Sequence, residues 1–121
     1  MPTINEVIER VDKIKPNTYD EETKATWLYR VDGRISAEVM KEEPPAQYIY
    51  PDDGDKELLI PHPYDSVYDH YLQAMISYTN KEYADYNNAM IMYNEAIESY
   101  AKKYIRDHVP KSASNFRNVM G

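Results

Sequence analysis

Three histidines and several carboxylates are the side chains of this chain that could do chemistry. His62 and His70 flank Asp65 and Asp69, and these groups could bind a metal ion or transfer a proton if they converged. They fall on a proline-rich segment and a predicted helix, without the H-E-x-x-H spacing that brings two imidazoles to one helical face. We therefore predict neither a metal site nor a catalytic site there. His108 is better explained as a favourable charge near the C-terminal end of a helix.

The acidic residues also lack the spacing of a binding site. Asp20, Glu21 and Glu22 would occupy the first turn of a helix, where the helix dipole stabilises negative charge. The run at 52–55 lacks the terminal bidentate glutamate of a calcium loop, so we expect a turn. With three glycines in all, neither a P-loop nor a dinucleotide-binding fingerprint can be assembled. We expect no enzyme activity, no cofactor and no metal.

Length and composition narrow the class of protein. A chain of 121 residues fits one domain with a single modest core. The net charge of -7 disfavours a surface that binds nucleic acid phosphates, and the absence of cysteine removes disulfides and thiolate zinc sites. No apolar run approaches the roughly 20 residues that span a bilayer, and the N-terminus lacks a signal-peptide pattern. We expect a soluble, unexported protein without membrane contact.

Apolar periodicity predicts a first helix that opens with the capping box Thr3 and Glu6 and stops at Pro16. Its apolar face is Ile4, Val7, Ile8, Val11 and Ile14.

A second capping box, Thr18 with Glu21, predicts the start of the next helix, which should end near Lys41 because two prolines follow. Gly33 sits inside this helix at a cost of about 1 kcal/mol relative to alanine and marks either a close helix crossing or a bend. The buried face is Trp27, Leu28, Val31, Ile35 and Val39.

The segment 42–65 is the only long irregular stretch and holds five of the eight prolines. Two β-prone runs, 48–50 and 58–60, flank an Asp-Gly turn, so we predict that the segment forms either an irregular loop or a β-hairpin. An isolated hairpin is marginal in water, so this one would lie on the helices or pair with another chain. Long loops in compact domains are often functional.

Two further helices follow this segment. Asp65 or Ser66 would cap a helix that runs to about Thr79, with Val67, Tyr68, Tyr71, Leu72, Met75 and Ile76 facing inward. After a break at Asn80, a long helix covers about 81–108, and the short link makes the pair antiparallel. The fold class is thus all-α, a small bundle of about four helices with a long loop or β-hairpin between the second and third helices. Residues 1–109 form one helical domain, and 110–121 form a flexible C-terminal arm.

A stripe of mostly tyrosines follows one face of the last helix at spacings of three and four: Tyr83, Tyr86, Met90, Tyr93, Ile97, Tyr100 and Tyr104. Tyrosine suits a half-buried seam because its ring is apolar and its hydroxyl needs a polar partner. The stripe either packs inside the domain or is shared between the domain core and a neighbouring subunit.

Several segments carry a family resemblance. They are Ile4-Asn5-Glu6-Val7-Ile8-Glu9, Lys15-Pro16-Asn17, Thr26-Trp27-Leu28, Leu58-Leu59-Ile60-Pro61 leading to Pro63-Tyr64-Asp65, Tyr71-Leu72-Gln73-Ala74-Met75-Ile76 and Glu82-Tyr83-Ala84-Asp85-Tyr86-Asn87-Asn88. In these segments the chain resembles the small head–tail connector proteins, also called adaptor or head-completion proteins, of long-tailed phages and of prophages in low-GC Gram-positive bacteria. The likeness covers most of residues 4–105 and is a pattern of helices and aromatic positions, not a catalytic signature.

The resemblance implies a structural protein of the virion. Its helical domain would assemble in the host cytoplasm as a ring, dodecameric in this family, beneath the portal protein at the head–tail junction. The ring would extend the DNA channel and offer a docking platform to a tail-side completion or stopper protein. Genome DNA would pass through without sequence-specific binding, which fits the acidic balance because a basic lumen would hold phosphates.

Two segments are the expected protein interface. In the 42–65 segment, the contact residues for a neighbour or a tail-side partner would be Tyr48, Ile49, Tyr50, Leu58, Leu59 and Ile60. In the arm, the residues that would fold on docking to the portal are Phe116, Arg117, Val119 and Met120.

The alternative is a small, non-enzymatic regulatory or interaction protein that dimerises through the tyrosine-rich C-terminal helix. Such a protein would need no ring and should be a stable dimer at micromolar concentration. An enzyme would need polar groups that converge in a pocket, which the sequence does not indicate.

Overall fold

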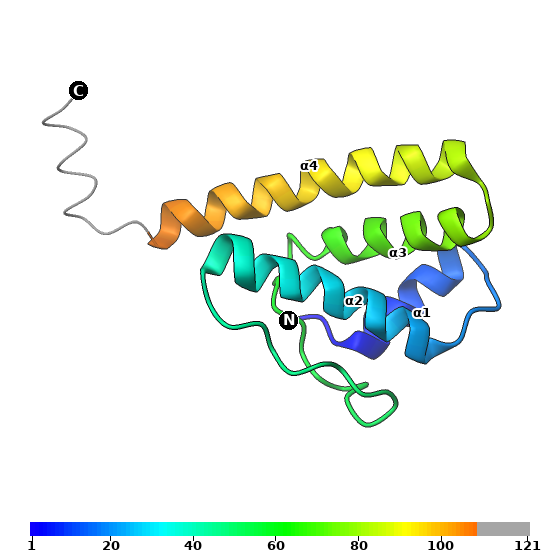
Figure 1. The fold of residues 1–121 in the computed structure, drawn as a ribbon, viewed down its shortest axis with the longest axis horizontal. Coiled ribbons are helices and arrows are strands. Elements are labelled where there is room, and N and C mark those ends of the chain that lie inside the picture. The colour runs from blue at the N-terminus through cyan, green and yellow to red at the C-terminus, as the bar shows by residue number, and fades with distance from the viewer. Residues whose placement is uncertain (109–121) are drawn as a thin grey trace, which may run out of the picture.

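The computed structural model describes residues 1–108, and four α-helices make up most of this range (Figure 1). The elements are α1 (Ile4–Ile14), α2 (Glu21–Ile35), the π-helical turn η1 (Ser36–Met40), α3 (Ser66–Thr79) and α4 (Tyr83–His108). No strand forms within residues 1–108, where the β-structure is a single bridge between Thr3 and Glu57. The predicted all-α bundle of four helices is confirmed.

Helix α1 begins where the sequence predicts. The Thr3 hydroxyl accepts the backbone N–H of Glu6 at 3.2 Å, and Ile4, Val7, Ile8 and Val11 form the buried face. Ile14 was expected on the same face but is exposed. It lies at the edge of the apolar stripe and lines a surface hollow with charged residues of α1.

Helix α2 begins two residues later than its capping box predicts. The cap is Asp20, whose carboxylate accepts the N–H of Thr23 at 2.8 Å, and not Thr18. A carboxylate is a stronger acceptor than a hydroxyl and also interacts favourably with the helix dipole. The predicted end near Lys41 is confirmed, because α2 continues through η1 and Lys41 closes the turn in a left-handed conformation, with φ of 57°.

Gly33 does not mark a close helix crossing. A Cβ atom at this position would meet no heavy atom within 4 Å. The backbone there has no positive φ. Its place in α2 therefore has no steric requirement that we can identify.

Between η1 and α3 the chain lies under the bundle as an irregular loop, one of the two predicted forms, and the alternative β-hairpin does not form (Figure 1). Its carbonyls instead accept the first free N–H groups of α1, from Ile4 to Lys56 at 3.1 Å and from Asn5 to Gly54 at 2.9 Å. The N–H of Leu58 in turn donates to the carbonyl of Pro2 at 2.8 Å. The N-terminus of α1 thus uses the loop carbonyls that would otherwise bond the second strand of a hairpin.

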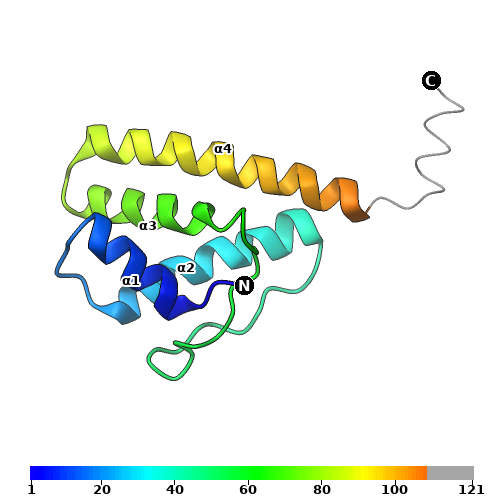
Figure 2. The ribbon, with the colours of Figure 1, turned by 180° about the vertical axis from the view of Figure 1, so that it is seen from behind.

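Helices α3 and α4 form the predicted antiparallel pair, and Figure 2 shows both lying above α1 and α2. The rings of Tyr64 and Tyr100 lie 5.5 Å apart, so the start of α3 falls beside the middle of α4. The C-terminal part of α4 therefore runs past α3 (Figure 1).

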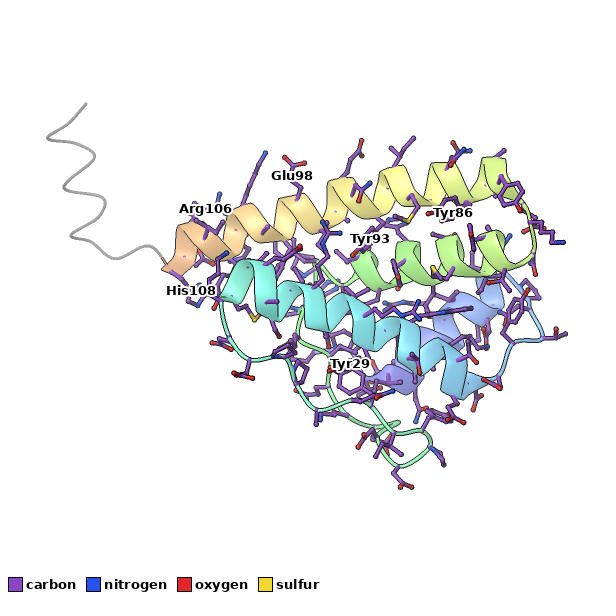
Figure 3. The ribbon with its side chains drawn as sticks, viewed as in Figure 1. Tyr29, Tyr86, Tyr93, Glu98, Arg106 and His108 are labelled. Atoms are coloured by element: carbon purple, nitrogen blue, oxygen red, sulfur yellow. The ribbon has the colours of Figure 1, made fainter. Side chains whose placement is uncertain are left out.

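The tyrosine stripe packs inside the domain over most of its length. Tyr93, Ile97 and Tyr100 are buried, and Tyr86, Met90 and Tyr104 are partly buried. Figure 3 shows Tyr93 on the side of α4 that faces the other helices. Tyr83, at the start of the helix, is exposed.

Candidate functional site

Of the six loop residues predicted to contact a partner, the structure buries three and leaves three accessible. Tyr48, Leu58 and Ile60 are buried in the core of their own chain, so their side chains do not offer a surface to another protein. They lie there because the loop must cover the lower faces of α1 and α2. Ile49 is exposed, and Tyr50 and Leu59 are partly buried, so these three keep an accessible surface.

The four residues predicted in the C-terminal arm, Phe116, Arg117, Val119 and Met120, lie outside the described residues.

The most unusual group in the described part of the chain is a fully buried carboxylate, Asp32 of α2. One oxygen accepts the hydroxyl of Tyr68, from α3. The other accepts the hydroxyl of Tyr48 and, at 3.2 Å, the backbone N–H of Leu59. The Tyr68 hydroxyl also accepts the N–H of Ile60 at 2.8 Å. The cluster therefore joins two helices to both halves of the loop.

The electrostatics of this cluster follow from burial. Burial raises the pKa of the Asp32 carboxyl above its ordinary value, and the hydrogen bonds from Tyr48, Tyr68 and Leu59 offset only part of that effect. Burial, together with the neighbouring carboxylate, also raises the pKa of both tyrosines. The hydroxyls therefore stay protonated and act as donors. The cluster fixes the loop and holds no activated nucleophile or base.

A second polar contact fixes α1 against α2. The buried ammonium of Lys24 lies 2.9 Å from both carboxylate oxygens of Asp12 and donates to the side-chain oxygen of Asn17 at 3.2 Å. Asn17 in turn accepts the N–H of Tyr19. These bonds set the connection between the two helices.

Arg10 ties α1 to the start of α3. Its guanidinium contacts Asp69 at 2.5 Å and Asp65 at 3.3 Å. Asp65 is the residue before α3, but its carboxylate makes no capping bond and serves this ion pair instead. Burial raises the pKa of Asp69, although Arg10 opposes the shift.

The histidines do not gather into a metal site in the described range. His62 lies 3.3 Å from Asp65 on the protein surface, and no group of three potential metal ligands occurs within residues 1–108. His108 is the last residue of α4 and lies 2.8 Å from the carbonyl oxygen of Tyr104, as expected for a side chain at a helix C-terminus.

The sequence carries a signal for the buried carboxylate of Asp32. Asp32 lies four residues after Leu28 and beside Val31, within the predicted apolar face of α2. A lone carboxylate on such a face requires buried donors, and tyrosine hydroxyls are suitable donors. The spacing could not have named Tyr48 and Tyr68, because only the folded loop and α3 bring them together.

Further surface features lie along α4. Ile91 and Ile105 are exposed on this helix. A groove of about 360 Å³ lies between η1, the end of α2 and the second half of α4. Its lining includes Ile35, Val39, Ile97 and Ala101, with Glu38 and Glu98 among the polar residues. The exposed apolar residues and this groove are the features suited to protein contact.

Comparisons with protein-family models, with characterised proteins and with solved structures found no match. Among residues 1–108, no helix has both the length and the apolar character needed to cross a membrane.

Proposed function

We propose that this protein is a structural head–tail connector, a subunit that forms a ring under a phage portal and extends the DNA channel. The observation that carries the proposal is the position in the fold of the segments that resemble the connector family. They supply the first half of α1, part of α2, the middle of α3, the start of α4 and the loop segment that Asp32 holds. All of them belong to one helical body, as the resemblance implies.

The pinned loop supports a role in protein contact. Ile49 is 63% exposed, yet its backbone is held firmly. Its N–H donates to the Asp53 carboxylate at 2.7 Å, and its carbonyl accepts the N–H of Asp53 at 2.7 Å. An apolar side chain on an ordered turn loses little conformational entropy on binding. We assign Ile49 as the main loop contact to a ring neighbour or tail-side protein.

The acidic balance fits a channel protein. The chain carries a net charge of -7, so a ring of many copies would repel DNA phosphates more than it attracts them. Such a lumen would let DNA slide.

The direct test is assembly on a portal. The full chain would be mixed with the portal protein of the phage or prophage whose genome encodes it, and the complex examined by native mass spectrometry and negative-stain electron microscopy. We expect a ring of subunits on one end of the portal. Absence of binding at tens of micromolar would overturn the proposal.

Two variants locate the contacts. Deleting residues 111–121 should abolish portal binding, because we assign docking to the arm. Ile49→Ser should leave portal binding intact but weaken ring closure or binding of the tail-side protein. Ile14→Ser is the matched control, since Ile14 is equally exposed on α1. Portal binding that survives the deletion would contradict the role of the arm.

A further inference from the structure

The groove beside η1 opens close to the point where α4 ends. Its apolar residues, Ile35, Val39, Ile97 and Ala101, come from α2, η1 and the second half of α4. Figures 1 and 2 both show the C-terminal end of α4 lying beside the end of α2. Ala101 lies seven residues before His108, the last residue that the structure describes. The rest of the chain, residues 109–121, therefore begins near this groove.

The groove is selected by its apolar lining and not by its charge. Glu38 pairs with Arg34 at 2.7 Å and Glu98 pairs with Lys102 at 3.3 Å, so the charges around it are already matched within the chain. Two other hollows are more polar. The one on α1 is lined mainly by charged side chains, and the one between α1, α3 and α4 is lined mainly by polar side chains. An occupant of the groove would be held by apolar side chains.

The sequence that follows α4 ends in such side chains. Pro110 predicts that the helix does not continue far beyond His108. Small and polar residues then follow as far as Asn115. In 111–121 the large apolar residues are Phe116, Val119 and Met120, and their spacing of three and four places them on one face of a helical turn. The chain thus carries a polar spacer and then one apolar group.

The spacer is long enough to bring this group to the groove. Phe116 comes eight residues after His108, and eight extended residues span up to about 26 Å. Ile97 lies eleven residues before His108, which is about 17 Å back along α4. An apolar cavity of about 150 Å³ can hold a benzene ring. The groove, at about 360 Å³, has room for the ring of Phe116 and a second side chain.

Charge favours a return of this segment to its own body. All 21 acidic residues of the chain lie in 1–108, whereas 109–121 contains Lys111 and Arg117 and no acid. A basic segment is attracted to an acidic body at long range. Because the two are covalently joined, the effective concentration is high and each contact can be weak.

We propose that the segment 109–121 turns back along α4 and inserts Phe116, with Val119 and Met120, into the groove between η1 and α4 of the same chain. The contact does not depend on the connector role, because it forms within a single free chain. Its failure would leave the portal experiment unaffected. A portal that binds the arm would compete with the groove for these side chains.

A spin label tests this contact in the full chain. The chain has no cysteine, so Ser114→Cys provides a single site for a nitroxide. In nitrogen-15 spectra, we expect the amides of Val39 and Ala101 to lose most of their intensity while the nitroxide is oxidised and to regain it on reduction. The amide of Tyr83, about 27 Å from Ala101 along α4, should keep its intensity.

Two variants of the labelled chain test the side chains involved. Phe116→Ser should restore most of the lost intensity at Val39, whereas Asn118→Ser, a polar change off the apolar face, should not. In the groove, Ala101→Arg should displace the segment because it adds a long charged side chain to the lining. Ala84→Arg, at an exposed alanine of the same helix, is its matched control. Circular dichroism would verify that these variants keep their helix content.

Three results would overturn the proposal. The first is a loss of intensity at Val39 and Ala101 that does not exceed the loss at Tyr83. The second is a Phe116→Ser variant that behaves like Asn118→Ser. The third comes from mixing unlabelled nitrogen-15 chains with spin-labelled chains of natural isotope content. Broadening of Val39 in this mixture would mean that a second copy supplies the segment.

Discussion

At the scale of residues, a buried carboxylate holds three parts of the chain in contact. Asp32 accepts hydrogen bonds from α3 and from both halves of the loop, and its partner Tyr68 accepts a further one from Ile60. Buried polar groups of this kind stabilise a single arrangement when every member is paired. No buried side-chain nitrogen or oxygen within residues 1–108 lacks a partner.

We expect Tyr68→Phe to lower the free energy of unfolding by about 1–3 kcal/mol, because it leaves the Oδ1 oxygen of Asp32 and the N–H of Ile60 each without a buried partner. Urea denaturation would measure the change. The control is Tyr83→Phe, at an exposed position, which should change stability by less than about 0.5 kcal/mol. Equal effects of the two variants would show that the cluster does not stabilise the fold.

The pH dependence of stability should report the ionisation of Asp32. Burial raises its pKa above 3.8, so the folded protein binds this proton more tightly than the unfolded chain. The stability that Asp32 contributes is therefore complete below pH 3.8 and is lost as the pH rises through the raised pKa. Relative to Asp32→Asn, which cannot ionise, the wild type should lose stability as the pH rises from below 3.8 through the raised pKa of Asp32.

Urea denaturation of the wild type and Asp32→Asn across that range would measure this difference. Contributions from the other titrating groups largely cancel in it. If the wild type instead gained stability relative to Asp32→Asn as the pH rose, the account of this carboxylate would be wrong.

At the scale of elements, much of the fold could be predicted because it depends on local sequence. The cap at Thr3, the span of α3 and the break after Thr79 follow from hydrogen-bonding side chains and apolar spacing near each site. The choice between a loop and a β-hairpin could not be predicted, because the groups that compete for the hydrogen bonds of the segment are distant in sequence. The free N–H groups of Ile4 and Asn5 donate hydrogen bonds to loop carbonyls some fifty residues away. The burial of Tyr48 and the role of Asp32 depend on that same long-range contact.

Alanine substitutions at two glycines, one in α2 and one in the loop, should change stability in opposite directions. Gly33→Ala should raise the free energy of unfolding by about 0.5–1 kcal/mol, because alanine favours the helix and a Cβ there meets no atom within 4 Å. Gly54→Ala should lower stability, because its Cβ would come within 2.5 Å of the Asn5 side chain, which bonds Tyr50. Thermal denaturation would measure both. A stabilised Gly54→Ala would mean that the loop is not held against α1.

At the scale of the whole molecule, the protein combines a rigid body with separate surfaces for contact. The loop is pinned against α1, α2 and α3, and Ile49 projects from it. The end of α4 runs past α3 and carries Ile105. Surfaces at different places on one body suit an assembly in which each subunit meets several partners.

The most direct test of the connector account is electron microscopy of the full chain mixed with the portal protein encoded in the same genome. We predict a closed ring of about twelve subunits on one end of the portal, with its channel continuous with the portal channel. A portal that stays bare, while the chain remains a monomer or a dimer, would contradict the account and favour the small regulatory protein.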